Sequence, residues 1–138
     1  MTLNGVPMTF EYKMLVIMTC FFLVAWLPAS IAKWQAFGGN WLASNRRPPL
    51  DKELAQWGQR AERAHHNLKD YFPGFIVAIL LLGSLNKFDQ QTAWASGLYV
   101  VGRMGHLTSY IAGNVLMRSL TFFLSMGCNF YLLVKTLG

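Results

Sequence analysis

The chain has 138 residues, of which 54% are hydrophobic and only 13% are charged. An ordinary soluble domain carries about 25% charged residues, so this composition excludes such a domain and indicates a protein that lies in the lipid bilayer. Membrane topology and attraction to anionic lipid headgroups account for the net charge of +6, so we expect membrane lipids and not nucleic acid as partners.

The first predicted helix covers residues 12–34. Nineteen uncharged residues separate Lys13 from Lys33, close to the ~20 that cross a ~30 Å hydrocarbon core as a helix. A signal peptide is the alternative, because small residues precede a possible cleavage site after Ala32. Signal peptides carry their positive charge before the apolar run, whereas here most basic residues follow it, so we expect the helix to be retained.

A long loop follows, because the segment from Phe37 to Glu53 contains Gly-Gly and Pro-Pro. Three further helices are predicted, at residues 54–86, 90–112 and 116–137. A turn near Lys87 and a helix end at Gly113-Asn114 separate them. The sequence therefore predicts one all-α domain over residues 1–138, an integral membrane four-helix bundle.

The basic residues predict the orientation of this bundle. Nine of the twelve Lys and Arg residues lie toward the side of the first and third connections, and three lie toward the other side. Cytoplasmic segments carry the excess of Lys and Arg, so both termini are expected outside, and the protein is expected in a bacterial inner membrane.

The segment from Arg60 to Phe75, RAERAHHNLKDYFPGF, passes from charged to apolar within one predicted helix. Four of its polar residues fall within an arc of about 80° at 100° per residue, and so share one face: Arg60, Arg63, Asn67 and Asp70. Two interpretations stay open. The stripe is a ligand site, or its arginines are interfacial anchors that snorkel to the headgroups and pair with the aspartate.

Polar residues of the third and fourth helices favour a ligand site. Arg103 precedes Ala112 by nine residues and so lies about 13 Å inward from the helix end, deeper than an anchor needs. His106 lies beside it, Tyr110 shares its face, and Arg118 opens the fourth helix on the same membrane side. Together with the stripe, the set has four arginines and one aspartate, which predicts an anionic ligand with carboxylates.

A metal site is not expected. Glu62 and His65 have the Glu-x-x-His form of di-iron bundles, which need a second copy that this sequence lacks. His65 and His66 point about 100° apart on a helix and are poor joint ligands. Cys20 and Cys128 lie in apolar runs and are expected to be inert core residues.

The run Arg63-Ala64-His65-His66-Asn67, followed by Asp70 and Pro73, resembles the second-helix signature of the MAPEG superfamily, the membrane-associated proteins in eicosanoid and glutathione metabolism. The segment RMGHLTSYIAGNVLMRS, residues 103–119, is similar to the family's third-to-fourth helix segment. The resemblance covers nearly the whole chain. It implies a homotrimer of four-helix subunits that binds glutathione, a co-substrate, between neighbouring subunits near the cytoplasmic face.

The resemblance also implies roles for individual residues. By position, glutathione is held by Arg63, Asn67, Asp70 and Tyr71 from the second helix and by Arg103 and Tyr110 from the third. Arg60 and His106 complete the expected binding set, and Arg118 is expected to be catalytic as the arginine that stabilises the thiolate. The chain departs from the family at two of these positions, because Asp70 replaces the commoner Glu and His106 stands where the eicosanoid synthases have Tyr.

The expected function is that of a glutathione-dependent transferase or peroxidase acting on lipophilic electrophiles or lipid hydroperoxides. The alternative is a non-catalytic lipid-binding or accessory membrane protein of the same fold. The combination of Arg, Asn and acid favours the enzyme, because it is more than packing requires.

Overall fold

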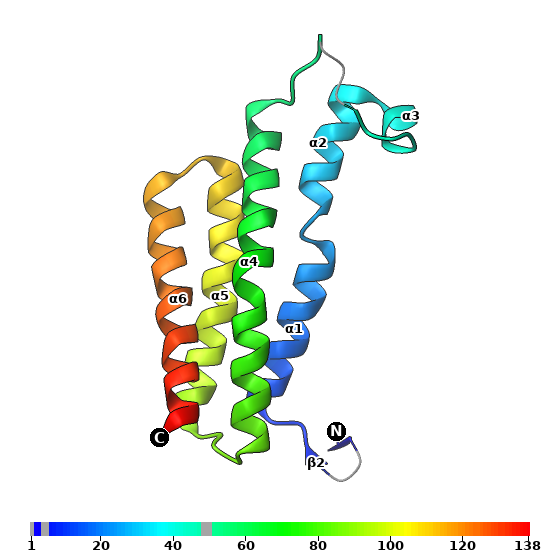
Figure 1. Cartoon of the computed structure of the whole chain (residues 1–138). Coiled ribbons are helices and arrows are strands. Elements are labelled where there is room, and N and C mark those ends of the chain that lie inside the picture. The colour runs from blue at the N-terminus through cyan, green and yellow to red at the C-terminus, as the bar shows by residue number, and fades with distance from the viewer. Residues whose placement is uncertain (1, 4–5, 48–50) are drawn as a thin grey trace.

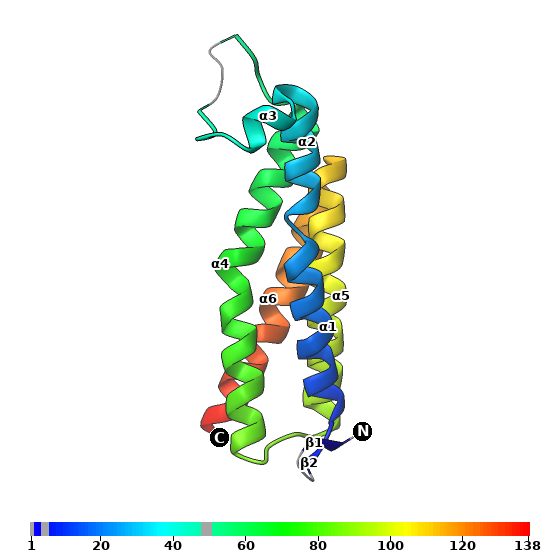
Figure 2. The same ribbon diagram turned by 90° about the vertical axis from the view of Figure 1, so that its right-hand side faces the viewer.

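The computed structural model describes residues 2–3, 6–47 and 51–138. Two short strands precede the helices, and β1 pairs with β2 in antiparallel fashion. The elements in chain order are β1 (Thr2–Leu3), β2 (Val6–Pro7), α1 (Phe10–Val24), α2 (Leu27–Phe37), α3 (Gly39–Leu42), α4 (Gln56–Ser84), α5 (Gln90–Ala112) and α6 (Val115–Leu137). The long helices run side by side as a bundle, with both termini at the same end (Figures 1 and 2). The predicted all-α fold class is confirmed.

The first span is two helices, where the sequence predicts one continuous helix over residues 12–34. α1 ends at Val24, and α2 begins at Leu27 with Pro28 in its first turn. Proline has no N–H to donate to the carbonyl group four residues earlier and clashes with it, so the helix breaks at this point. The indole of Trp26 covers the break by donating a hydrogen bond to the carbonyl oxygen of Leu23 at 2.7 Å.

Local capping defines the ends of α5 and α6. The Asp89 side chain accepts hydrogen bonds from the backbone N–H groups of Gln91 and Thr92, and the Thr92 hydroxyl bonds the Asp89 backbone in return. Such a capping box satisfies donors that the first helical turn leaves unpaired. At the other end of α5, Gly113 has a φ of 80°, a left-handed conformation that glycine adopts without a steric penalty.

α4 is the central helix, because it packs against α1, α2, α5 and α6. α5 and α6 approach each other closely at Gly102, where an added Cβ would lie 3.0 Å from the Cβ of Ser125. Phe75 of α4 stacks on Tyr99 of α5 with ring centroids 4.0 Å apart. The core therefore lies along α4, between the α1 side and the α5–α6 pair.

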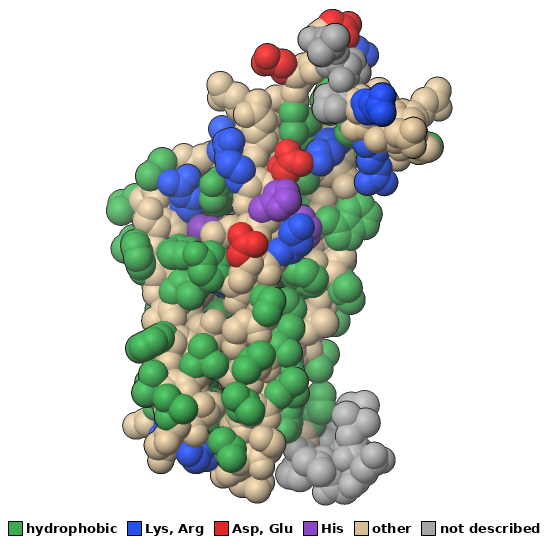
Figure 3. Space-filling model, in the orientation of Figure 1, with side chains coloured by type: hydrophobic (Ala, Val, Ile, Leu, Met, Phe, Trp, Pro, Cys, Tyr) green, Lys and Arg blue, Asp and Glu red, His purple; other side chains and the backbone are tan. Residues whose placement is uncertain are grey.

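Much of the outer surface is apolar. Within the described residues, two segments are long and apolar enough to cross a membrane, Phe10–Phe37 and Val115–Leu137, and only 17% of each apolar window is buried within the subunit. The core helix of a soluble protein would be mostly buried. In Figure 3, hydrophobic side chains are spread along the visible face of the bundle, whereas charged side chains gather toward the end that carries α2, α3 and the start of α4. This distribution positions a polar site at one end of an apolar bundle.

Candidate functional site

Arg103 of α5 is the central residue of the site. Its side chain is 1% exposed, and its Nη2 donates a hydrogen bond to Oδ1 of Asn67 on α4 at 2.9 Å. The Nε and Nη1 atoms are buried and have no hydrogen-bond partner, and no carboxylate pairs with Arg103 among the residues that the structure describes. A buried guanidinium without a counter-ion is costly, so the site is suited to an anion.

His106 joins α5 to the first turn of α6. Its side chain is 3% exposed, and Nδ1 lies 2.9 Å from the carbonyl oxygen of Arg118. Because a carbonyl oxygen only accepts, Nδ1 carries the hydrogen in this contact. In the neutral ring, Nε2 is then an acceptor, and it is buried without a partner in the structure.

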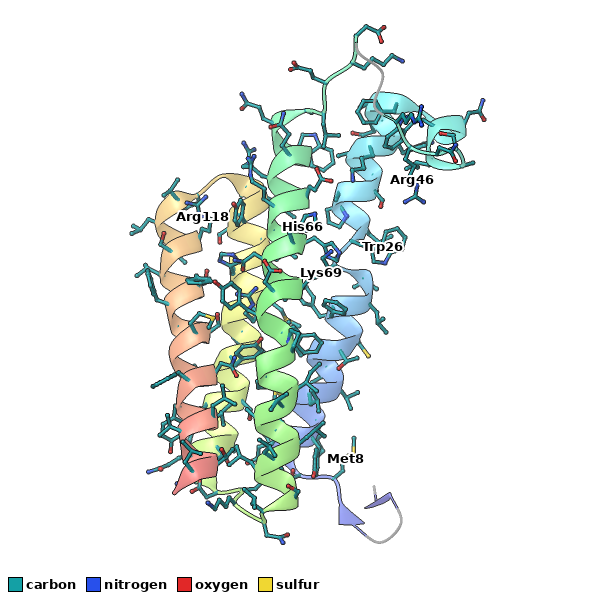
Figure 4. All side chains as sticks on the ribbon, in the orientation of Figure 1. Met8, Trp26, Arg46, His66, Lys69 and Arg118 are labelled. Atoms are coloured by element: carbon teal, nitrogen blue, oxygen red, sulfur yellow. The ribbon has the colours of Figure 1, made fainter. Side chains whose placement is uncertain are left out.

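Aromatic rings connect the two arginines. The Cζ atom of Arg118 lies over the Tyr110 ring, 4.7 Å from its centroid, and that of Arg103 lies 5.9 Å from the centroid of Tyr71. Phe122 of α6 contacts both Tyr71 and His106, with centroids 5.3 and 5.5 Å away. Figure 4 places Arg118 in the first turn of α6, on the same half of the bundle as His66 and Lys69 of α4. α4, α5 and α6 thus each contribute to one continuous cluster.

Arg60 has a different position from the one the sequence suggests. Its Nε donates to the carbonyl oxygen of Ile111 at 2.9 Å, and a Cβ added to Gly113 would lie 3.3 Å from its Cζ. A cation at this point satisfies an unpaired carbonyl group and interacts favourably with the helix dipole. Arg60 therefore closes the C-terminal end of α5 and is not in contact with the Arg103 cluster.

Arg63 and Asp70 also lie apart from the cluster. Both side chains are exposed and make no hydrogen bond or ion pair with the part of the chain that the structure describes. Of the predicted set, the structure brings together Asn67, Tyr71, Arg103, His106, Tyr110 and Arg118. Of the four polar residues of the α4 stripe, Asn67 therefore joins the cluster around Arg103, whereas Arg60, Arg63 and Asp70 lie apart from it.

The exposed carboxylate of Asp70 lies deep along the bundle. Arg103 is about 13 Å from the C-terminal end of α5, and its bond to Asn67 fixes the same level on α4. Asp70 lies one turn further from that end, about 4.5 Å beyond Asn67. Asp70 is therefore exposed at a depth where a bilayer would present hydrocarbon.

Several contacts in this half of the protein were not predicted from the sequence. Lys33 of α2 forms an ion pair with Glu62 of α4, with Nζ and Oε1 2.6 Å apart, which links the first span to the polar part of α4. The available signal was their opposite charge, with Lys33 near the end of the first predicted helix and Glu62 in the charged first part of the second. Phe122 gave no signal, because one phenylalanine in an apolar run is indistinguishable from its neighbours. In the described residues no group of three or more His, Cys, Asp or Glu side chains is placed to hold a metal ion.

The apolar outer surface, the spanning helices and the buried polar cluster together define the class, an integral membrane helical bundle. Residues 14–138 match the MAPEG family, and the chain belongs to this family. The match confirms the resemblance carried by residues 63–73 and 103–119. The family consists of membrane proteins of glutathione and eicosanoid metabolism and is made up mostly of glutathione-dependent enzymes. No curated protein gives a significant match to this sequence.

Proposed function

We propose that the protein is a glutathione-dependent transferase or peroxidase that acts on lipophilic electrophiles or lipid hydroperoxides. The observation that carries the proposal is the buried Arg103 guanidinium, which is held by Asn67 and keeps two nitrogens without a partner. Family membership adds that glutathione is the usual co-substrate. Glutathione is an anion with two carboxylates, and a guanidinium binds a carboxylate through paired hydrogen bonds.

The remaining residues of the cluster fit the other groups of glutathione. Tyr110 offers a hydroxyl donor, and the His106 Nε2 atom offers an acceptor. We assign Arg118 to the thiolate, because its guanidinium is half-buried and held over an aromatic ring. A cation beside the sulfur favours the thiolate over the thiol, and the thiolate is the nucleophile.

The reaction of the thiolate then depends on the class of substrate. With an aryl halide, sulfur bonds to carbon and the halide leaves. With a hydroperoxide, sulfur bonds to the distal oxygen as the O–O bond breaks. The alcohol departs after protonation, and a second glutathione converts the sulfenic acid to disulfide and water. Arg118 has the same role in both reactions, because each begins from the thiolate.

We propose that the active unit is a homotrimer that associates through the exposed face of α4. A charge at the centre of a membrane helix costs about 2.5–3.5 kcal/mol or more if it faces lipid. Asp70 and Arg63 avoid this cost if their face meets neighbouring copies. Between subunits, Asp70 would bind the glutathione ammonium and Arg63 a carboxylate, so each site is completed by a second copy.

We place the site near the cytoplasmic face of a bacterial inner membrane. Cytoplasmic segments are rich in Lys and Arg, and the α2–α4 and α5–α6 connections lie at the more basic end of the bundle. A reporter fused after Gly138 should therefore be active only outside the cytoplasm.

The test is glutathione binding and turnover by the detergent-purified protein. Calorimetric titration measures binding, and an aryl halide and cumene hydroperoxide measure the two reactions. Arg103→Met keeps the volume of the side chain and removes the charge, and it should weaken glutathione binding by about 1.5–3 kcal/mol, the value of a hydrogen bond to a charged group. The thermal stability without glutathione should not fall, because the substitution removes a buried charge that has no counter-ion.

Arg47→Ala is the matched control, since Arg47 is an exposed arginine in the loop after α3. Its affinity should equal that of the wild type. Wild-type protein that binds no glutathione contradicts the proposal. Binding without turnover of either substrate supports the accessory protein in place of the enzyme.

A further inference from the structure

Beyond the Arg103 cluster, two buried residues of the bundle have side-chain polar atoms without a hydrogen-bond partner among the described residues. Tyr99 of α5 is 0% exposed, and its hydroxyl has no hydrogen-bond partner. Asn129 of α6 is 4% exposed, and its Oδ1 has none. Neither residue has a role in the glutathione site proposed above. Buried polar groups in proteins are paired in the great majority of cases, so two orphans in one region need an explanation.

Contacts with α4 place these two residues at one level of the bundle. The Tyr99 ring stacks on Phe75 at a centroid distance of 4.0 Å. A Cβ added to Gly74 would lie 2.8 Å from Nδ2 of Asn129. Adjacent residues of α4 therefore contact Tyr99 from α5 and Asn129 from α6, and the missing side chain of Gly74 leaves room for the amide.

The row of unpaired atoms continues to Arg103. Tyr99 precedes Arg103 by four residues on α5, so the two side chains lie on one face of the helix about one turn apart. The Nε and Nη1 atoms of Arg103 are likewise buried and without a partner. Asn129, Tyr99 and Arg103 thus form a row of buried polar groups with unpaired atoms inside the bundle.

The hydrogen-bonding character of the row identifies what it binds. Oδ1 of Asn129 only accepts, so an anion would be repelled there, whereas the Arg103 nitrogens only donate. The Tyr99 hydroxyl does both. A small molecule that both donates and accepts suits each of these groups, and buried water in proteins typically makes about three hydrogen bonds.

We propose that Tyr99 and Asn129 bind water inside the α4–α5–α6 bundle and that this water extends to Arg103. The consequence concerns the charge on Arg103. Water held by Tyr99 and Asn129 replaces part of the hydration that the guanidinium loses inside the membrane, and so stabilises the site before any anion arrives.

Hydroxyl-radical footprinting of the full chain without glutathione tests the bound water directly, because radicals formed from bound water label the side chain beside it. Tyr99 should be labelled although it is fully buried. Phe72 is the control, since it is an aromatic residue with 4% exposure that packs on Phe22 in the apolar core. Labelling of Tyr99 that is no greater than labelling of Phe72 overturns the proposal.

Thermal unfolding of Tyr99→Phe, Asn129→Leu and the double variant gives a second test through the sign of the change. If water bridges the two groups, each single substitution lowers Tm by about 3 °C or more, and the double variant loses less than the sum. If the groups are true orphans, each substitution removes a desolvated polar group and raises Tm. A rise in Tm, or additive losses, overturns the proposal. Tyr131→Phe, at an exposed tyrosine of α6 whose hydroxyl donates to Oε1 of Gln91 at 2.7 Å, measures the change in Tm that follows the loss of one surface hydrogen bond. Because no glutathione is present, failure here is distinct from failure of the proposed function.

Discussion

Arg118 shows how a single residue connects packing to chemistry. Its carbonyl oxygen accepts from His106, and its guanidinium lies over Tyr110. The backbone contact would survive any substitution of the side chain, so the charge can be removed without releasing the start of α6. The contribution of the guanidinium can therefore be measured separately from that of the fold.

We predict that Arg118→Ala reduces the fraction of bound glutathione present as thiolate at neutral pH. Turnover should fall by at least tenfold, about 1.4 kcal/mol, and should partly recover as the pH is raised, whereas glutathione affinity should change less. Ultraviolet absorbance of the thiolate, followed from about pH 5 to about pH 9, measures the change. Arg118→Lys keeps a cation and should restore part of the signal. Identical titration curves for wild type and Arg118→Ala would remove Arg118 from the mechanism.

Within the site, the pairing level of Arg103 and Asn67 could be predicted from the sequence. The distance of Arg103 from the helix end gives its depth in the membrane, and Asn67 lies on the polar stripe of the second predicted helix. The burial of Tyr99 and Asn129 could not be predicted from the sequence, because it depends on the register between α4, α5 and α6. The contact that Arg60 makes could not be predicted for a related reason. Its partner is a backbone carbonyl group, which has no sequence signal of its own.

At the scale of the element, the start of α5 depends on Asp89. Its carboxylate caps the helix and forms an ion pair with Lys135 of α6, with Oδ2 and Nζ 2.8 Å apart. The hydrogen bond from Lys135, followed by that from the Thr92 backbone, holds the pKa of Asp89 below its usual range. The lowered pKa means that this stabilisation is present above the unfolded pKa and is lost as the pH falls through the folded pKa.

We predict that Asp89→Asn, which keeps an acceptor for the cap and removes the charge, lowers Tm less than Asp89→Ala does. The difference in Tm between wild type and Asp89→Asn should shrink as the pH falls from about 6 to about 3, because the wild-type carboxylate becomes protonated. Circular dichroism melts at several pH values measure both effects. A difference that stays constant over this range would contradict an electrostatic role for Asp89.

The elements themselves were partly visible in the sequence. Gly113-Asn114 predicted the end of α5, and the structure has Gly113 in the left-handed conformation that the turn requires. The break between α1 and α2 was not predicted, although Pro28 stands in the middle of the run. An apolar run long enough to span the membrane favours one helix by composition, whereas one residue without an N–H decides the local geometry.

At the scale of the whole molecule, the proposed trimer associates through the exposed face of α4. Val77 lies seven residues after Asp70 and so shares its face, and it is 49% exposed. Val16 of α1 is 48% exposed on a different helix, which makes it a control of equal exposure. In protein with Cys20 and Cys128 replaced by Ala, Val77→Cys should form covalent dimers on oxidation in the membrane, and Val16→Cys should not. Light scattering should give a protein mass of three chains of 15.6 kDa. Equal cross-linking at both positions, or a monomeric mass, would contradict association through α4.

The break at Ala25 and Trp26 bears on how the protein adapts to bilayers of different thickness. The first span, Phe10–Phe37, has 28 residues and would be about 42 Å long as one straight helix, longer than the ~30 Å hydrocarbon core. A rigid helix of this length would have to tilt as a whole and would change its packing on α4 and α5. We predict that the break at the middle of this span lets α1 keep its contacts with α5 while α2 changes its inclination against α4. Hydrophobic mismatch would then be absorbed about midway along the first span, and the α4–α5–α6 cluster would keep its geometry in thin and thick membranes. Distances between spin labels on α1 and α2, compared in short-chain and long-chain lipids, measure that change of angle.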